Sequence, residues 1–237
     1  MTTLPVFCTP LFADWPLPVP LAGCQMRSTR FDHQRLLPAD FQHSQVQAPA
    51  NIQRAVAKRQ AEYLAGRLCA RAALQASGAD AVVPGTDEER APIWPPGFCG
   101  SITHGDGWAA AVVARANAWR GLGLDVESRL DSARAQHLAG EILTPDELSR
   151  LDPEQAALQI TLTFSLKESL FKALFPLVRQ RFYFEHAELI QWSAGGHARL
   201  RLLTDLSAEW HRGKEIDGQY SLQDDRLLSL VAIPADI

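Results

Sequence analysis

The sequence predicts an α+β fold, because apolar residues recur with helical period in some segments and alternate with strand period in others. A hydrophobic fraction of 46% over 237 residues is enough for one large domain or two small ones. The predicted helices cover residues 51–77, 132–143 and 155–172, the last interrupted near 161–165, and a short helix opens at Thr144. The predicted strands cover residues 100–104, 108–114, 122–126, 182–184, 187–192, 198–203 and 227–233.

A boundary between two halves is expected in the turn at residues 115–120, which joins two strands that we expect to pair as a hairpin. It divides the chain into residues 1–118 and 119–237. Before the first helix, five prolines between positions 5 and 20 favour an extended, wrapping segment with edge strands.

Charge and cysteine content exclude several classes of protein. The net charge of −4 gives no global positive field, so neither nucleic acid nor an anionic membrane is expected as a partner. Four scattered cysteines without C-x-x-C spacing are typical of a reduced, cytoplasmic protein. No leader-like segment or apolar run of membrane-spanning length is present. We expect a monomer.

The stretch Gly121–Glu127 reads as a strand that presents two carboxylates. Apolar residues alternate with Gly123, Asp125 and Glu127, so the two acids share one face of the strand. Two neighbouring carboxylates repel each other unless a cation or a proton lies between them. Their oxygen ligands suit Mg²⁺ that also holds a phosphate, whereas the alternative is a surface strand with solvated acids.

The stretch 164–174 reads as a largely buried helix, with Ser165 or Thr163 available as its N-cap. Glu168 and Lys172 lie four residues apart and therefore share one helix face. A surface ion pair is the ordinary interpretation of such spacing. The apolar surroundings favour a functional one instead, with Glu168 as a third oxygen ligand and Lys172 facing a phosphate.

The pattern G-[IL]-D-x-E followed by F-S-x-K-E-S-x-x-K resembles that of the 4′-phosphopantetheinyl transferases. The similarity is to the surfactin-type class, which includes the enterobactin synthetase component D enzymes. It extends from Ile52 to Phe184 and includes the element S-I-T-H at Ser101–His104. The resemblance implies two similar α+β halves packed as an intramolecular pseudo-dimer.

The resemblance also implies an activity, that of a Mg²⁺-dependent holo-[acyl-carrier-protein] synthase. Such an enzyme transfers the 4′-phosphopantetheine arm of coenzyme A to a serine of an apo acyl or peptidyl carrier protein and releases 3′,5′-ADP. The carriers would serve fatty acid, nonribosomal peptide or siderophore biosynthesis. By resemblance, Asp125, Glu127 and Glu168 hold the metal, for which Mn²⁺ is an alternative. Glu168 is also the expected base, and Lys172 neutralises the pyrophosphate.

Basic residues of the predicted helix 51–77 supply the expected contacts to coenzyme A. Five cations face a single acid, Glu62, which leaves a local positive patch on an acidic protein. By resemblance, Arg59 and Arg67 bind the 3′-phosphate, whereas Arg54, Lys58 and Arg71 are expected at the surface.

Three further residues are expected to contact the donor. Thr103 and His104 would contact the pyrophosphate, with His104 also a competing candidate for the base. A basic residue that many relatives carry before a proline is replaced by Ala91, so Arg90 is the expected substitute.

Two other functions use the same residues. A Mg²⁺-dependent phosphohydrolase or nuclease would employ the three carboxylates and would turn over phosphoesters without an acceptor protein. A non-catalytic binder of carrier protein or nucleotide would have lost its chemistry. The presence of all four residues Asp125, Glu127, Glu168 and Lys172 speaks against the latter.

Overall fold

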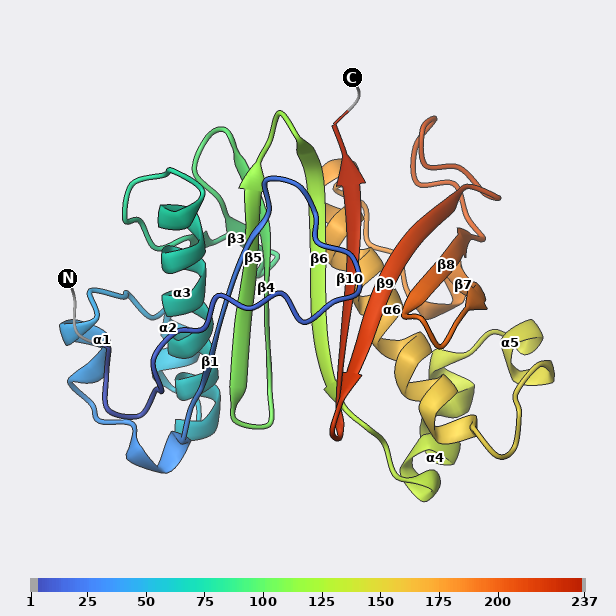
Figure 1. Cartoon of the computed structure of the whole chain (residues 1–237), viewed down its shortest axis with the longest axis horizontal. Helices are drawn as coiled ribbons and strands as arrows, with labels where there is room; N and C mark the ends of the chain where they lie inside the picture. The colour runs from blue at the N-terminus through green and yellow to red at the C-terminus, as the bar shows by residue number, and fades with distance from the viewer. Residues whose placement is uncertain (1–3, 236–237) are drawn as a thin grey trace. The chain divides into compact units, whose positions relative to one another are not determined.

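Helices and antiparallel sheets are combined in both halves of the chain, which confirms the predicted α+β class (Figure 1). The computed structural model describes residues 4–235. It divides into two units, the first consisting mainly of Leu21–Trp119 and the second mainly of Arg120–Pro234, with Pro16–Pro20 assigned to the second. Each unit places one long helix against an antiparallel sheet.

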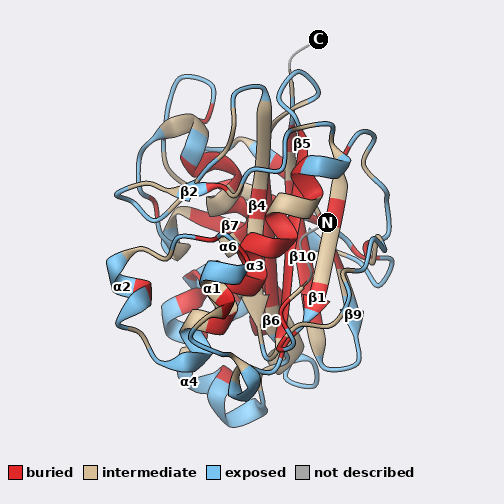
Figure 2. Cartoon of the chain, turned by 90° about the vertical axis from the view of Figure 1, so that its left-hand side faces the viewer, coloured by how far each residue is buried: buried red, intermediate tan, exposed pale blue. Residues whose placement is uncertain are grey.

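The first unit has a three-stranded sheet in the order β1-β5-β4, and α3 packs chiefly on its central strand. These elements are β1 (Gln25–Arg30), β4 (Phe98–Gly105), β5 (Trp108–Arg115) and α3 (Ala57–Ala76). The alanine-rich centre of β5 is fully buried, which lets the helix lie close to the strand. Figure 2 shows α3 buried along most of its length, with exposed residues at its two ends.

The predicted helix 51–77 is wrong at its N-terminal end, because the structure breaks it into α2 (Ala50–Gln53) and α3. Val56 is the extended N-cap residue of α3 and is 73% exposed, so it is not part of the core. The side-chain amide of Gln60 donates to the carbonyl groups of Gln53 and Ala55 at 3.0 and 2.9 Å. These bonds satisfy the end of α2 and stabilise the break.

Shorter elements complete the first unit. They are the 3₁₀ helix η1 (His33–Arg35), α1 (Asp40–His43), and the hairpin of β2 (Gly85–Thr86) with β3 (Pro92–Ile93). The proline-rich segment is extended as predicted, because Cys8 and Phe12 form bridges with Phe31 and Ser28 beside β1.

The second unit has a five-stranded sheet in the order β6-β10-β9-β8-β7, with α6 along one face (Figure 1). The strands are β6 (Trp119–Ser128), β7 (Ala187–Trp192), β8 (His197–Leu202), β9 (Glu215–Gln223) and β10 (Arg226–Pro234). The helices are α4 (Ser132–Ile142), α5 (Pro145–Ser149), α6 (Ala156–Val178) and the 3₁₀ helix η2 (Phe184–His186). The capping box predicted at Thr144 is present.

The predicted interruption near residues 161–165 is wrong, since α6 runs unbroken through it and neither Thr163 nor Ser165 is an N-cap. The hydroxyl group of Thr161 donates to the carbonyl of Ala157 at 2.7 Å and accepts from the amide of Leu130 at 3.1 Å. Polar side chains that would favour a helix end are therefore satisfied inside the helix.

Three strand predictions are also corrected. β5 lies between β1 and β4, and β6 pairs with β10, so the expected hairpin between β5 and β6 is not formed. Residues 182–184 form no strand but lead into η2. β9 was missed because its sequence, E-I-D-G-Q-Y-S-L-Q, is mostly polar and contains a glycine. Within residues 4–235, no helix combines the length and the apolarity needed to cross a bilayer.

Candidate functional site

The acidic strand β6 lies unusually close to α6, and two glycines permit this approach. A methyl group on Gly123 would overlap the carbonyl oxygen of Ser169, and one on Gly121 would overlap that of Ala173. Both obstacles are helix backbone, which cannot move aside as a side chain can. Alternation along the strand then turns Asp125, on the same face, directly towards α6.

Asp125 is 5% exposed and receives a hydrogen bond on each carboxylate oxygen. The ammonium of Lys172 donates to Oδ1 at 2.6 Å, and the hydroxyl of Ser165 donates to Oδ2 at 2.9 Å. Lys172 also donates to the carbonyl of Leu124 at 3.1 Å. The structure thus brings together residues of the two motifs and excludes a solvated surface acid at this position.

Glu127 and Glu168 lie in the same electrostatic environment. Burial, followed by the charge of Asp125, raises the pKa of Glu127 to about 7, with Glu168 adding to the rise and Lys172 opposing it. Burial also raises the pKa of Glu168, again with Asp125 adding to the rise and Lys172 opposing it. Three half-buried or buried carboxylates close enough to repel each other form a locally negative, all-oxygen site.

The donor chemistry of this site fits a hard divalent cation. Oxygen ligands with an excess of negative charge are those that Mg²⁺ and Mn²⁺ accept. Between Leu4 and Ala235, however, no group of three or more His, Cys, Asp or Glu side chains is gathered closely enough to hold a metal ion. The carboxylate oxygens are therefore suitable ligands for the ion by their chemistry. In this structure, one oxygen of Asp125 accepts a hydrogen bond from Lys172.

Lys167, within the same helical motif, was not predicted to be important and is the most constrained lysine of the second unit. Its side chain is 2% exposed, and its ammonium donates to Glu147 at 2.7 Å and to the carbonyls of Ile142 and Phe184 at 2.9 Å each. Burial lowers the pKa of Lys167, although Glu147 opposes the change. All three donors are used, so Lys167 joins α6 to the segments on either side of it.

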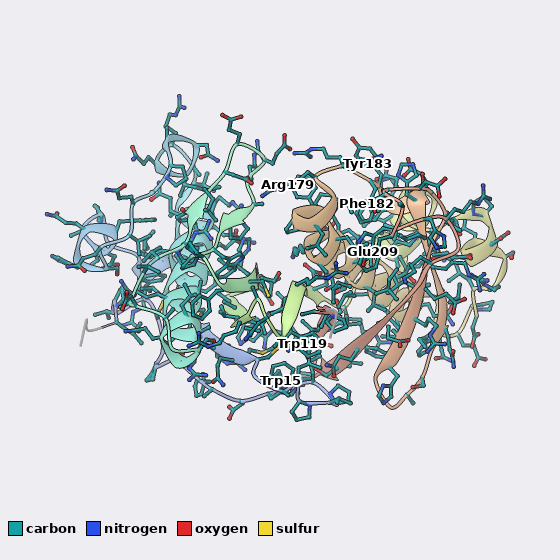
Figure 3. The ribbon with its side chains drawn as sticks, turned by 90° about the horizontal axis from the view of Figure 1, so that it is seen from above. Trp15, Trp119, Arg179, Phe182, Tyr183 and Glu209 are labelled. Carbon is teal, nitrogen blue, oxygen red and sulfur yellow. The ribbon has the colours of Figure 1, made fainter. Side chains whose placement is uncertain are left out.

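A cavity of about 200 Å³ opens beside Glu168, within the second unit. Its walls are largely aromatic, with Phe171 and Phe182 in ring contact at 5.3 Å between centroids. Figure 3 shows Phe182 and Tyr183 on the segment that connects α6 to β7. The predicted base therefore borders an apolar chamber, where an electrostatic interaction is stronger than in water.

In the first unit, the structure brings Arg59 of α3 into contact with His104 of β4. The Arg59 guanidinium lies 2.8 Å from Nε2 of His104, and Nδ1 of His104 lies 3.6 Å from the Glu62 carboxylate. A guanidinium can only donate, so Nε2 accepts and the ring proton of a neutral His104 is on Nδ1, facing Glu62. In this arrangement the basic lone pair of His104 is occupied.

Arg67 is buried without a carboxylate partner among the contacts of the described residues. It is 5% exposed, and it donates to the hydroxyl of Thr86 at 2.6 Å and lies 4.8 Å from the ring centroid of Tyr63. Its Nε atom is buried and has no hydrogen-bond partner within residues 4–235. A buried cation with only neutral partners is costly, which favours an anionic ligand here.

Thr103 and Arg90 take different places. Thr103 is 3% exposed and neighbours His104 on β4, where adjacent side chains point to opposite faces. Arg90 is exposed, at a positive φ of 69° in the turn between β2 and β3, the hairpin that also carries Thr86.

Burial disfavours the thiolate form of all four cysteines. Burial raises the pKa of Cys8 and Cys24 to about 12 and that of Cys99 to about 11. It also raises that of the fully buried Cys69. Because the thiolate is the reactive form of cysteine, this burial disfavours a nucleophilic role for the four thiols.

Comparison with known proteins identifies two matching family models. The model of the 4′-phosphopantetheinyl transferase N-terminal domain matches residues 47–114, and that of the 4′-phosphopantetheinyl transferase superfamily matches residues 121–228. The second match contains Asp125, Glu168 and Lys172.

Curated relatives agree with the family models. The 4′-phosphopantetheinyl transferase Npt of Nocardia iowensis is 36% identical over 58% of this chain and 62% of its own length. Enterobactin synthase component D of Salmonella typhi is 36% identical over 66% of this chain and 64% of its own length. The transferase Svp of Streptomyces mobaraensis is 33% identical over 78% of this chain and 77% of its own length. The chain thus spans less than two thirds of the first two relatives.

Among solved structures, the holo-ACP-synthase from Plasmodium yoelii matches 50% of this chain and 97% of its own. The TM-score is 0.38 at 16% identity, so the assignment rests on the sequence matches. Those matches cover both units and both motifs, and by them this chain belongs to the 4′-phosphopantetheinyl transferase superfamily, in the branch of enterobactin synthase component D.

Proposed function

We propose that this protein transfers the 4′-phosphopantetheine arm of coenzyme A to a serine of an apo acyl or peptidyl carrier protein. The serine oxygen forms a bond to the phosphorus next to pantetheine, and the bond from that phosphorus to the bridging oxygen breaks. The serine proton passes to a base, and 3′,5′-ADP leaves. Family membership supports this proposal, and the observation that carries it is the junction of Asp125, Ser165 and Lys172.

The second unit supplies the groups that phosphoryl transfer needs. The reaction requires charge neutralisation, positioning and activation of a hydroxyl. Asp125, Glu127 and Glu168 would hold Mg²⁺, or Mn²⁺, and the ion would neutralise charge on the pyrophosphate. The side chain of Lys172 is 27% exposed, so a phosphate oxygen can reach its ammonium. The side chain of Lys167 is only 2% exposed and is already paired with Glu147.

Glu168 is the proposed base. Burial raises its pKa, which makes it a better proton acceptor than a solvated carboxylate, and it borders the apolar chamber. His104 is less suited to this role, because its Nε2 accepts from Arg59. We assign His104 to donor binding. Thr103 stays a predicted contact.

In the first unit, Arg67 and Arg59 are the proposed contacts to the 3′-phosphate of coenzyme A. Within residues 4–235, the buried guanidinium of Arg67 has only neutral partners, and Arg59 lies two helical turns earlier on α3. Arg90, on the same hairpin as the Arg67 partner Thr86, is the proposed substitute for the basic residue absent at Ala91.

A monomer in the cytoplasm is the proposed setting. Four unpaired thiols suit a reducing compartment. Carrier proteins of siderophore or nonribosomal peptide synthesis are the proposed acceptors, and those of fatty acid synthesis are included.

The decisive experiment is the intact mass of an apo carrier protein after incubation with this protein, coenzyme A and Mg²⁺. Addition of one phosphopantetheine group supports the proposal. Formation of 3′,5′-ADP without a change in carrier mass would instead indicate the phosphohydrolase.

The same assay separates the two candidates for the base. Glu168→Gln keeps one oxygen ligand, so it should bind coenzyme A yet transfer very slowly even at saturating metal. His104→Ala should weaken donor binding and keep a measurable rate at saturating coenzyme A. A larger loss of turnover in His104→Ala than in Glu168→Gln would reverse the assignment.

A further inference from the structure

Behind Asp125, three buried hydroxyl groups form a linear series in which Ser229 contacts both Ser165 and Ser169. Ser165 and Ser169 come from α6, and Ser229 comes from β10, outside both sequence motifs. All three are 0% exposed. The oxygen of Ser229 lies 2.7 Å from that of Ser165 and 2.8 Å from that of Ser169.

The direction of these hydrogen bonds follows from counting protons. Each hydroxyl group has one proton, and an ionised carboxylate can only accept. Ser165 donates its proton to Asp125, so Ser229 must donate to Ser165. The proton of Ser229 is then already used, so Ser169 is the donor, and its single proton is shared between the hydroxyl of Ser229 and the Ser229 carbonyl at 3.1 Å. The chain therefore runs in one direction, from Ser169 through Ser229 and Ser165 to Asp125.

Packing alone does not account for this arrangement. Alanine would fill an interface between a helix and a sheet without burying a hydroxyl group, which costs free energy unless it is fully paired. A serine or threonine inside a helix usually bonds the carbonyl four residues before it, as Thr161 does on the same helix. Ser165 instead directs its proton to a carboxylate 40 residues away.

We propose that Ser169, Ser229 and Ser165 form a directed hydroxyl chain that holds the Asp125 carboxylate in the orientation needed to bind a divalent cation. Ser229 is a positioning residue, since it acts only through Ser165. Ser165 holds one carboxylate oxygen and Lys172 the other, which leaves a lone-pair site on each oxygen for the cation. The inference rests on the proposed function for its assignment of Asp125 as a metal ligand.

The test measures Mn²⁺ binding to the full chain by electron paramagnetic resonance, with neither coenzyme A nor carrier present. Ser229→Ala should weaken Mn²⁺ binding about tenfold, the size of effect found for residues that orient metal ligands. Ser229→Cys keeps a weak donor, so its affinity should fall between those of the wild type and Ser229→Ala, and it serves if the alanine variant does not fold.

Ser221→Ala is the matched control. Ser221 lies on the neighbouring strand β9, and its buried hydroxyl has no hydrogen-bond partner within the described part of the chain. Its loss should leave Mn²⁺ binding unchanged. Equal Mn²⁺ affinities for Ser229→Ala and Ser221→Ala would overturn the proposal.

A double variant tests whether the hydroxyl groups act in series. If Ser229 acts through Ser165, the variant carrying both Ser165→Ala and Ser229→Ala should lose no more Mn²⁺ affinity than Ser165→Ala alone. Additive losses would mean independent packing effects and would contradict a chain.

A transfer assay on the same proteins separates this proposal from the proposed function. If Mn²⁺ affinity falls from wild type through Ser229→Cys to Ser229→Ala but no carrier is modified, the hydroxyl chain is supported and the transferase activity is rejected. If the carrier is modified but Ser229→Ala leaves Mn²⁺ affinity unchanged, the transferase activity is supported and the hydroxyl chain is rejected.

Discussion

Two lysines of α6 each form an ammonium–carboxylate pair, Lys167 with Glu147 and Lys172 with Asp125, and the two pairs differ in solvent exposure. Lys167 and Glu147 are 2% and 5% exposed in their side chains. Besides Glu147, the Lys167 ammonium donates to two backbone carbonyls. Lys172 and Asp125 are 27% and 7% exposed. Both pairs are short, at 2.7 and 2.6 Å. Contact distance therefore does not distinguish them, whereas accessibility does.

The Lys167–Glu147 pair, here called the closed pair, is also held by backbone hydrogen bonds to its carboxylate. Glu147 accepts from the backbone amides of Leu189 and Thr144 at 2.6 and 2.8 Å, besides the bond from Lys167. It thereby connects α5, α6 and β7. The Lys172–Asp125 pair, here called the open pair, keeps free lone pairs on the carboxylate and a partly exposed ammonium. Within one helical motif, the first lysine is enclosed by structural contacts and the second stays partly accessible.

The largest expected effect is on stability, from Lys167→Ala. The substitution leaves Glu147 buried without its cation and two carbonyls without a donor, which should cost about 3–5 kcal/mol in the free energy of unfolding. Denaturant unfolding measures it. A loss below about 1 kcal/mol would show that the pair is not the closed structural contact described above.

Lys172→Ala should have the opposite profile. Its unfolding free energy should fall by less than that of Lys167→Ala, because Lys172 is partly exposed and Asp125 keeps the hydrogen bond from Ser165. Phosphopantetheine transfer should fall by roughly 10²–10³, as for loss of a group that stabilises developing charge. Intact-mass kinetics with an apo carrier give the rate, and transfer within threefold of wild type would refute the assignment of Lys172.

Gly123→Ala should disturb the open pair from a distance. The added methyl group meets the backbone oxygen of Ser169, so the strand must move away from α6 at a cost of about 3 kcal/mol. The control is Gly140→Ala in α4, where nothing lies near the new methyl group and stability should rise by roughly 0.5–1 kcal/mol. Calorimetric unfolding of both variants checks the contrast, and equal melting temperatures would contradict the close packing.

A smaller effect is expected for Arg67→Ala, which extends the comparison to a buried cation without a carboxylate. The KM for coenzyme A should rise about tenfold, as for loss of one charged hydrogen bond, and the KM for 3′-dephospho-coenzyme A should hardly change. Lys58→Ala, which removes an exposed cation of the same helix, is the control. Equal losses on both donors would mean that Arg67 does not face the 3′-phosphate.

Several features were predictable from the sequence because they depend on neighbours along the chain. The capping box at Thr144 needs only residues three apart, and it is present. The burial of Trp108–Ala114 follows from a continuous apolar run. The local pattern gave a wrong prediction where polar side chains form hydrogen bonds that the sequence pattern does not show. Thr161 and Ser165 suggested a helix end, yet both are paired inside an unbroken α6.

By itself, the sequence determined the α+β class, the family, and the two motifs that carry Asp125, Glu168 and Lys172. Only the tertiary structure decided which partner each charged residue has and how accessible it is. Lys167 finds Glu147 20 residues away, Lys172 finds Asp125 47 residues away, and Ser165 finds Ser229 64 residues away. A local pattern specifies which face a side chain occupies, but its accessibility and its hydrogen-bond partners are fixed only when distant segments pack together.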